Sequence, residues 1–283
     1  MAAHRGRLDV VATPIGNLAD LSPRAREALA GADLVAAEDT RRTGLLLGSL
    51  GLSRPLVSLH EHNEEERIGR LLGAMQAGQV VALVSDAGTP LLSDPGFALV
   101  RAAAAAGIEV RPIPGVSAIT AALSIAGLPT DRFAFEGFLP ARAAERRRVL
   151  GQLATEARTL VWFEAPHRIA QTLADLLAVF GPQRRAVLTR ELTKTYESTY
   201  RGTLAELAAL ARADADLARG ELTLIVEGAA RAADGDAQLL ARALPLLLKD
   251  LPPARAAAIA AQLSGVPRAE AYRQALALGA GNP

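Results

Sequence analysis

The sequence contains no cysteine among its 283 residues. This absence excludes disulfide bonds and thiolate metal ligands, and it is compatible with a reducing compartment. No apolar run approaches the ~18–20 residues that a membrane-spanning helix needs, and no segment has the charged and apolar regions of a secretory signal. We therefore expect a soluble protein of the cytoplasm.

Net charge is also small, at +1, and lysine is scarce: of the 31 cationic side chains, only Lys194 and Lys249 are not arginine. This balance argues against a polybasic nucleic-acid binder, so any contact with RNA has to come from local patches. Half of the residues are apolar, which is enough for a substantial core. The length favours two domains with an appendage.

The most informative stretch runs from Val80 to Gly96. A run typical of a buried strand, Val80–Val84, breaks into Ser-Asp-Ala-Gly-Thr-Pro, and an alanine-rich helix begins at Phe97. Strand, polar loop and helix in this order are typical of an α/β sheet, whose ligands bind beyond the carboxyl ends of the strands. The loop has neither G-x-G-x-x-G nor G-x-x-x-x-G-K, so its pattern alone leaves an ordinary turn and a ligand site equally open.

A second loop has matching chemistry. The strand expected at Val110–Ile113 ends in Pro114-Gly115, and Ser117 is placed to cap the helix that follows. Two such loops suggest two walls of one pocket.

The strand and helix pattern divides the chain into three parts. Five strands alternate with helices over residues 1–128, which we expect to form an N-terminal α/β domain. Five more are expected over residues 129–229, where the alternation in Ser198–Thr203 favours an antiparallel strand in a mixed sheet. Ala229–Gln238 is interpreted as a linker. Residues 238–283 contain two short helices around a Gly-containing turn, and this predicts either a helix-turn-helix unit or a hairpin that packs on a dimer partner.

The two loops together resemble a known family. Asp-Ala-Gly-Thr-Pro at 86–90 and Pro-Gly-Val-Ser-Ala at 114–118 are similar to motifs of the tetrapyrrole methylase superfamily, which uses S-adenosylmethionine. The resemblance implies two α/β subdomains of the class III methyltransferase type around a cofactor cleft. It also implies a homodimer.

Four further motifs narrow the resemblance. They are ATPIGNL at 12–18, AEDTR at 37–41, FEAPHR at 163–168 and RELTK at 190–194. They resemble the branch of the superfamily that methylates a cytidine 2′-hydroxyl in small-subunit ribosomal RNA, and the resemblance covers nearly the whole chain. The implied substrate is this RNA or the assembled small subunit.

The resemblance also implies where S-adenosylmethionine binds. The cofactor residues that it implies are Pro14, Asp86, Ala87, Gly88, Thr89, Ser117, Ala118, Phe163 and Thr223. Asp86 would direct its carboxylate toward the cationic or hydroxyl side of the cofactor. In the alternative, it only caps its own turn.

Several basic residues are candidates for RNA contacts. Arg41 and Arg42 could clamp phosphates, although carboxylates beside arginines are also typical of a solvated ion-pair cluster. His62 and Arg168 are further expected RNA contacts. His60 and His62 have no well-spaced third ligand, so we predict no metal site. The arginines over 142–148 indicate a solvated helix face or an RNA-facing patch.

Glu191 and Lys194 are the catalytic candidates. A ribose 2′-hydroxyl is a poor nucleophile until its proton leaves, and a positioned base contributes ~10²–10⁴ in rate. In-line alignment with the methyl group can supply most of the rest. Lys194 could accept the proton if its pKa were lowered, or it could bind phosphate, and the sequence does not separate its role from that of Glu191.

Two rival functions have sequence features of their own. A tetrapyrrole C-methyltransferase would use the same scaffold, and its carboxylated substrate would also favour arginines in the cleft. A DNA-binding regulator would be led by the tail. The expected tail helices, however, carry few cations, namely Arg255 and Arg273, with Arg268 near the turn.

Overall fold

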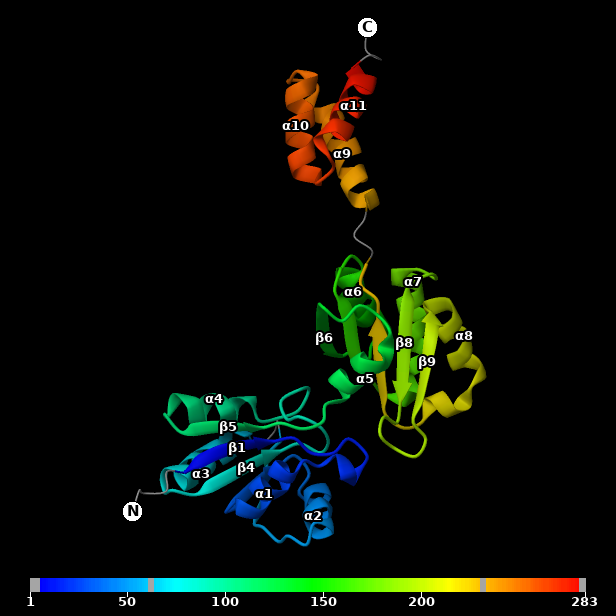
Figure 1. Ribbon diagram of the computed structural model, residues 1–283. Helices are drawn as coiled ribbons and strands as arrows, with labels where there is room; N and C mark the ends of the chain where they lie inside the picture. The colour runs from blue at the N-terminus through cyan, green and yellow to red at the C-terminus, as the bar shows by residue number, and fades with distance from the viewer. Residues whose placement is uncertain (1–5, 61–63, 230–232, 280–283) are drawn as a thin grey trace. The chain divides into compact units, whose positions relative to one another are not determined.

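The computed structural model describes residues 6–60, 64–229 and 233–279 (Figure 1). It divides into two compact units, Met1–Ala154 with Arg158–Glu227, and Thr155–Ala157 with Gly228–Pro283. The first unit contains two five-stranded sheets and the second contains helices. Among the residues described, no helix is both long and apolar enough to cross a membrane.

The first sheet is entirely parallel. Its strands are β1 (Arg7–Val11), β2 (Leu34–Ala37), β3 (Leu56–Ser58), β4 (Val80–Val84) and β5 (Glu109–Ile113). They lie in the order β3-β2-β4-β1-β5. Because β4 and β1 are central, the loops that follow them meet at one edge of the sheet, as expected for an α/β ligand site.

Both faces of the first sheet are covered. Along β4, Val81 and Leu83 point into a core shared with α3 (Glu64–Gln76) and α4 (Phe97–Ala105). Ala82 and Val84 point into the opposite core, which is shared with α1 (Pro23–Gly31) and α2 (Thr40–Ser49). This two-sided burial explains why the sequence of β4 is a continuous apolar run rather than an alternating one.

The second sheet is mixed, as the sequence predicted. Its strands are β6 (Phe133–Phe138), β7 (Thr159–Glu164), β8 (Arg185–Arg190), β9 (Ser198–Thr203) and β10 (Leu222–Val226), in the order β6-β7-β10-β8-β9. Only the β6–β7 pair is parallel. One face packs on α6 (Ala143–Leu153), α7 (Ile169–Phe180) and α8 (Leu204–Ala213) around the buried Trp162.

The opposite face of the second sheet is covered by α5 (Ala118–Ala126), the helix that follows the last strand of the first sheet. Ile119, Ala122 and Leu123 of α5 share a core with Val187 and Ile225 of the second sheet, and Figure 1 shows α5 against these strands. The start of α5 is therefore held between the two sheets. This places its first residues beside the ends of both.

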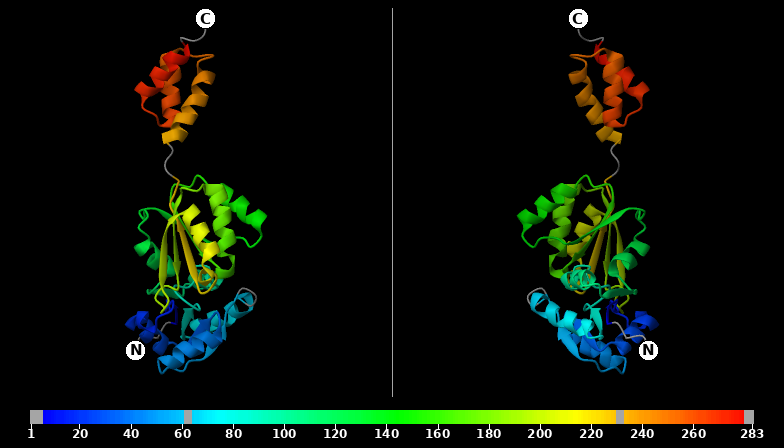
Figure 2. Two further views of the ribbon diagram at one scale, coloured as in Figure 1. Left: turned by 90° about the vertical axis from the view of Figure 1, so that its right-hand side faces the viewer. Right: turned by 90° about the vertical axis from the view of Figure 1, so that its left-hand side faces the viewer.

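The second unit is a bundle of α9 (Ala233–Leu247), α10 (Pro253–Ser264) and α11 (Arg268–Gly279) (Figure 2). Leu240 and Leu244 of α9 share its small core with alanines of α10 and α11. The predicted linker over Ala229–Gln238 is therefore wrong from Ala233 onward. Gly235 between two aspartates resembles a linker locally, but the alanines around it favour a helix and the leucines beyond it anchor that helix in the core.

Candidate active site

A cavity of about 420 Å³ is lined by loops of both sheets. Its size is within the ~300–1,000 Å³ typical of small-molecule sites. The first sheet and the start of α5 contribute Ile15, Glu38, Arg42, Asp86, Ala87, Gly88, Thr89, Leu92, Ser93, Asp94, Ser117 and Ala118. The second sheet contributes Phe138, Phe163, Glu164, Ala165, Pro166, Gly220, Glu221, Leu222 and Thr223.

The structure brings most of the expected cofactor residues together in this cavity. Those that line it are Asp86, Ala87, Gly88, Thr89, Ser117, Ala118, Phe163 and Thr223. Pro14 does not line it, and its neighbour Ile15 does. Neighbouring side chains of an extended segment point to opposite sides, and the sequence does not show whether Pro14 or Ile15 points toward the cavity.

Backbone hydrogen bonds fix the loop after β4. Thr13 and Gly88 exchange two of them, with N···O distances of 2.8 and 3.0 Å, and Thr89 Oγ1 donates to the carbonyl of Val116 at 3.1 Å. Gly88 has a φ of +82°, and a Cβ there would lie 3.3 Å from Cγ2 of Ile15. Glycine thus satisfies both the left-handed backbone and the close approach of the β1 loop. The three loops form one rigid wall.

Ser117 differs from our expectation. It occupies the N-cap position of α5, but its hydroxyl forms no capping hydrogen bond. Ser117 is instead one of the residues that line the cavity.

The first-sheet side of the cavity is acidic. Asp86 accepts a hydrogen bond from the Asp39 amide at 3.0 Å, and its other oxygen lies 3.3 Å from Arg42. Burial raises the pKa of Asp94 to about 6; a hydrogen bond with Ser85 opposes the shift, and the charges of Glu38 and Asp86 add to it. Burial and the charge of Asp86 likewise raise the pKa of Glu38. A cation bound here would relieve this repulsion.

Arg41 and Arg42 lie in the first turn of α2. Asp39 caps this helix by accepting from the Arg41 amide at 2.8 Å. Arg42 lines the cavity and Arg41 projects into solvent. The expected RNA contact at His62 lies outside the described residues, and the contacts at Arg41 and Arg42 stay predictions.

Lys194 is held by two carboxylates. Its Nζ lies 2.8 Å from Glu191 Oε1 and 3.0 Å from Glu221 Oε2. Burial by itself lowers the pKa of Lys194, but the hydrogen bonds with Glu191 and Glu221 outweigh it and the pKa is raised. The ammonium therefore keeps its proton near neutral pH, which disfavours a general-base role. Neither Lys194 nor Glu191 lines the cavity, whereas Glu221 does.

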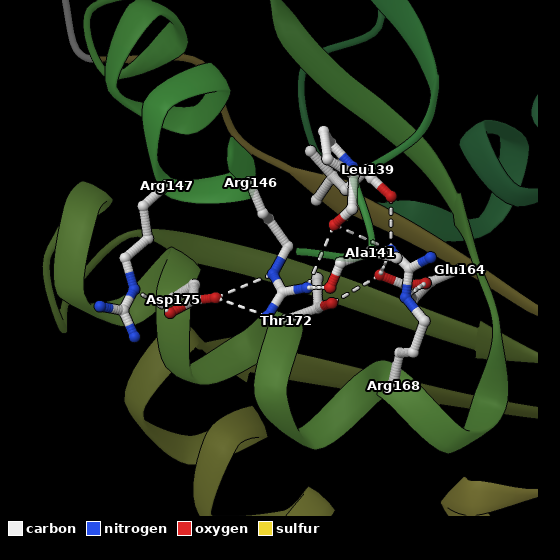
Figure 3. A network of polar contacts seen from close by, with 9 residues as sticks. Leu139, Ala141, Arg146, Arg147, Glu164, Arg168, Thr172 and Asp175 are labelled. Carbon is white, nitrogen blue, oxygen red and sulfur yellow. Dashed lines mark hydrogen bonds and ion pairs between the residues drawn. The ribbon is translucent and has the colours of Figure 1, made fainter. Parts of the chain in front are cut away.

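Arg168 points into the protein rather than outward (Figure 3). Its Nε lies 3.1 Å from Oε1 of Glu164, a buried residue of the cavity wall, and its guanidinium also donates to the carbonyl of Leu139. Thr172 donates to the second oxygen of Glu164 at 2.5 Å. These groups already engage the guanidinium, which leaves fewer of its donors for a phosphate. The expected contact of Arg168 with RNA stays a prediction.

A fully buried arginine, Arg146, lies beside the partly exposed Arg168 (Figure 3). Arg146, 1% exposed, contacts Asp175 at 2.7 and 2.8 Å, and it donates to the carbonyls of Pro140 and Ala141 at 3.2 and 3.1 Å. Arg147 also contacts Asp175, at 2.6 Å. The sequence predicted a solvated or RNA-facing patch for the arginines over 142–148, and this is wrong for the buried Arg146. The sequence feature that points to this network is Asp175, an acidic residue within the apolar stretch of α7.

The comparisons with known proteins agree with this fold. Residues 7–208 match the model of the tetrapyrrole (corrin/porphyrin) methylases, and residues 232–279 match a model described as the RsmI C-terminal HTH domain. The chain belongs to the tetrapyrrole methylase family. It is thus a methyltransferase that depends on S-adenosylmethionine, and the predicted helix-turn-helix tail is confirmed.

Its full-length relatives are proteins named ribosomal RNA small subunit methyltransferase I. The one from Pseudomonas aeruginosa is 53% identical over 274 residues, which cover 96% of this chain and 97% of the relative. The one from Xylella fastidiosa strain Temecula1 is 52% identical over 270 residues, covering 94% and 98%. The one from Escherichia coli O157:H7 is 50% identical over 273 residues, covering 96% and 95%.

Solved structures with the same fold are more distant. A uroporphyrin-III-C-methyltransferase from Thermus thermophilus has a TM-score of 0.55 at 24% identity, covering 79% of this chain and 94% of that one. The methyltransferase CobJ has a TM-score of 0.61 at 22% identity, covering 80% and 95%. These likenesses establish the fold and do not bear on the substrate.

Proposed function

We propose that this chain transfers a methyl group from S-adenosylmethionine to the 2′-hydroxyl of a cytidine in small-subunit ribosomal RNA. The observation that carries the proposal is the identity of 50–53%, over nearly the full length, to proteins named for small-subunit ribosomal RNA. The tetrapyrrole alternative has in its favour the description of the family model and fold likenesses at 22–24% identity. The proposal includes action in the cytoplasm as a homodimer.

The cavity fits the cofactor. Its apolar members Ile15, Phe163 and Leu222 suit the adenosine, and the Gly88 turn allows the loop that carries Ile15 to approach closely. Glu38 and Asp94 would stabilise the positive charge. When bound, S-adenosylmethionine supplies an electrophilic methyl group on a cationic sulfur.

Three cationic residues would face the RNA, namely Lys194, Arg41 and Arg42. Glu191 and Glu221 keep Lys194 protonated, so Lys194 would contribute a positive charge and a hydrogen-bond donor near the ribose rather than a base. Arg41 and Arg42 would contact phosphates, and bidentate guanidinium geometry suits that task. Alignment of the hydroxyl by these groups is then a main source of rate.

A labelling experiment tests the proposal. The protein is incubated with S-adenosylmethionine labelled in its methyl group and with isolated small subunits, free small-subunit RNA or uroporphyrinogen. We expect label in RNA that digests to 2′-O-methylcytidine. Label in uroporphyrinogen with none in either RNA substrate would contradict the proposal, and the two RNA arms decide which form is the substrate.

A further inference from the structure

Phe138 is an exposed aromatic residue in the wall of the cavity. It lines the cavity, yet 54% of its surface is exposed. Its ring stands 5.7 Å from that of Phe163, which in turn lies 4.9 Å from Phe135 in an edge-to-face arrangement. The exposed ring is therefore backed by two further aromatic rings.

The backbone of β6 directs Phe138 to this place. The pairing of β6 with β7 shifts register between Phe135 and Phe138, and Gly137 between them has a φ of +67°. Such bulges reorient a side chain at the end of a strand. A Cβ on Gly137 would lie 3.4 Å from Oγ of Ser93 on the opposite side of the cavity, so the bulge also brings the strand close to that loop.

The segment after Phe138 is fixed by the two arginines described above, the buried Arg146 and the partly exposed Arg168 (Figure 3). The carbonyl of Leu139 accepts from Arg168, and the carbonyls of Pro140 and Ala141 accept from Arg146. Glu164 and Asp175 form ion pairs with these two guanidiniums in turn. An exposed ring on a backbone held this firmly loses little entropy when it binds a flat partner.

Cations follow directly along the chain. Arg142 is exposed at the start of α6, and Arg148 is exposed six residues further along the chain. Arg147 lies between them, with its side chain 62% exposed. These residues suit the phosphates next to a base that rests on the ring.

We propose that Phe138 is the stacking platform for the base of the nucleotide whose ribose enters the cavity, and that Arg146 and Arg168 are positioning residues for it. The inference rests on the proposed function. Bases of RNA that leave their own stack are commonly received by aromatic side chains. The adenine of the cofactor is a less suitable occupant, because a small ligand buries most of its surface in the interior of a pocket and Phe138 is more than half exposed.

The test compares three variants with the wild type. Phe138→Ala removes the ring, and Phe138→Tyr keeps its face. Phe133→Ala is the matched control, because Phe133 is an exposed phenylalanine of the same strand that is not among the residues lining the cavity. Single-turnover methylation is measured at increasing concentrations of small subunits or free RNA, whichever the wild type methylates, and S-adenosylmethionine affinity is measured by calorimetry.

We expect Phe138→Ala to raise the half-saturating RNA concentration roughly 5- to 150-fold, the range for losing one base–aromatic stack. Cofactor affinity should stay within about twofold, since the loss concerns a single base contact. Phe138→Tyr should restore most of the RNA affinity, and Phe133→Ala should behave as wild type. An equal loss of cofactor affinity in Phe138→Ala would assign the ring to the cofactor and overturn the inference.

The positioning role has its own readout. Arg168→Lys keeps a charge beside Glu164 but loses the guanidinium that reaches the Leu139 carbonyl. It should weaken RNA binding in the wild-type background and cause no further loss in the Phe138→Ala background, because both changes remove the same stack. Additive losses would overturn the positioning role. If the wild type methylates RNA and Phe138→Ala leaves the half-saturating RNA concentration unchanged, this inference is refuted and the proposed function is not. If the wild type does not methylate RNA, the proposed function itself is refuted.

Discussion

On the first-sheet side of the cavity, Glu38 and Asp94 are partly buried and burial raises both pKa values. On the second-sheet side, Glu164 is paired with Arg168, and hydrogen bonding from Lys194 lowers the pKa of Glu191. Carboxylates are thus in two opposite electrostatic states, uncompensated in the first-sheet wall of the cavity and paired at Glu164 in the opposite wall and at Glu191, which is not among the lining residues. Carboxylates without full compensation are available to a cationic ligand, whereas paired carboxylates fix the loops that carry them.

The largest effect on stability is expected from removing Asp175, the carboxylate that pairs with the buried Arg146. Asp175→Ala leaves Arg146 buried without its carboxylate, and breaking such a pair costs about 3–5 kcal/mol of unfolding free energy. Urea denaturation measures the loss. Arg147→Ala, which removes the exposed partner of the same carboxylate, is the control and should cost about 0–1 kcal/mol. Equal effects of the two variants would refute the structural role of the buried pair.

Gly88→Val should disrupt the loop after β4, which forms part of the first-sheet wall of the cavity. A β-branched residue at a φ of +82°, with its Cβ 3.3 Å from Ile15, strains the loop by about 1–3 kcal/mol. We expect affinity for S-adenosylmethionine to fall about tenfold or more in calorimetry. Gly107→Val is the matched control, because Gly107 has a φ of +69° and nothing within 4 Å of its Cβ position. Cofactor affinity unchanged in a folded Gly88→Val protein would exclude the loop from the site.

The uncompensated charge should make cofactor binding depend on pH. A pKa of about 6 for Asp94 means that at pH 5 only about one tenth of this carboxyl is ionised. A cation binds the ionised form better, so affinity should rise with pH through about 6 and level off above it, with binding at pH 5 about tenfold weaker than at pH 7.5. Asp94→Asn should flatten the profile. A profile that falls with pH would contradict the assignment.

The smallest effect is expected at Lys194. Because its carboxylate partners raise its pKa, Lys194→Arg keeps the charge, and turnover should fall by a few-fold only, well short of the ~10²-fold or greater loss of a general base. Lys249→Arg replaces the only other lysine and serves as the control. A pH-dependent loss of 100-fold in single-turnover methylation would restore the general-base role.

The sequence predicted the features that are local in the chain. The Gly88 loop, the Ser117 segment and the strands around them are contiguous patterns, and the cavity gathers them because parallel strands end at one edge. The contact of Arg146 with Asp175, 29 residues away, depends on how α6 and α7 pack, which no local pattern encodes. The exposed ring of Phe138 was missed for the same reason, since a register shift between two strands decides its direction.

The strand order of the first sheet has a consequence for synthesis of the chain. Arg7 of β1 pairs with Val80 on one side and with Glu109 on the other. At about 5–20 residues per second, the ribosome needs several seconds after β1 emerges before either neighbour exists. During that interval β1 has no strand partner, so it is the segment of this sheet for which a holding chaperone would matter most. The strand between β4 and β5 is thus the first of the sheet to be made and among the last to be enclosed.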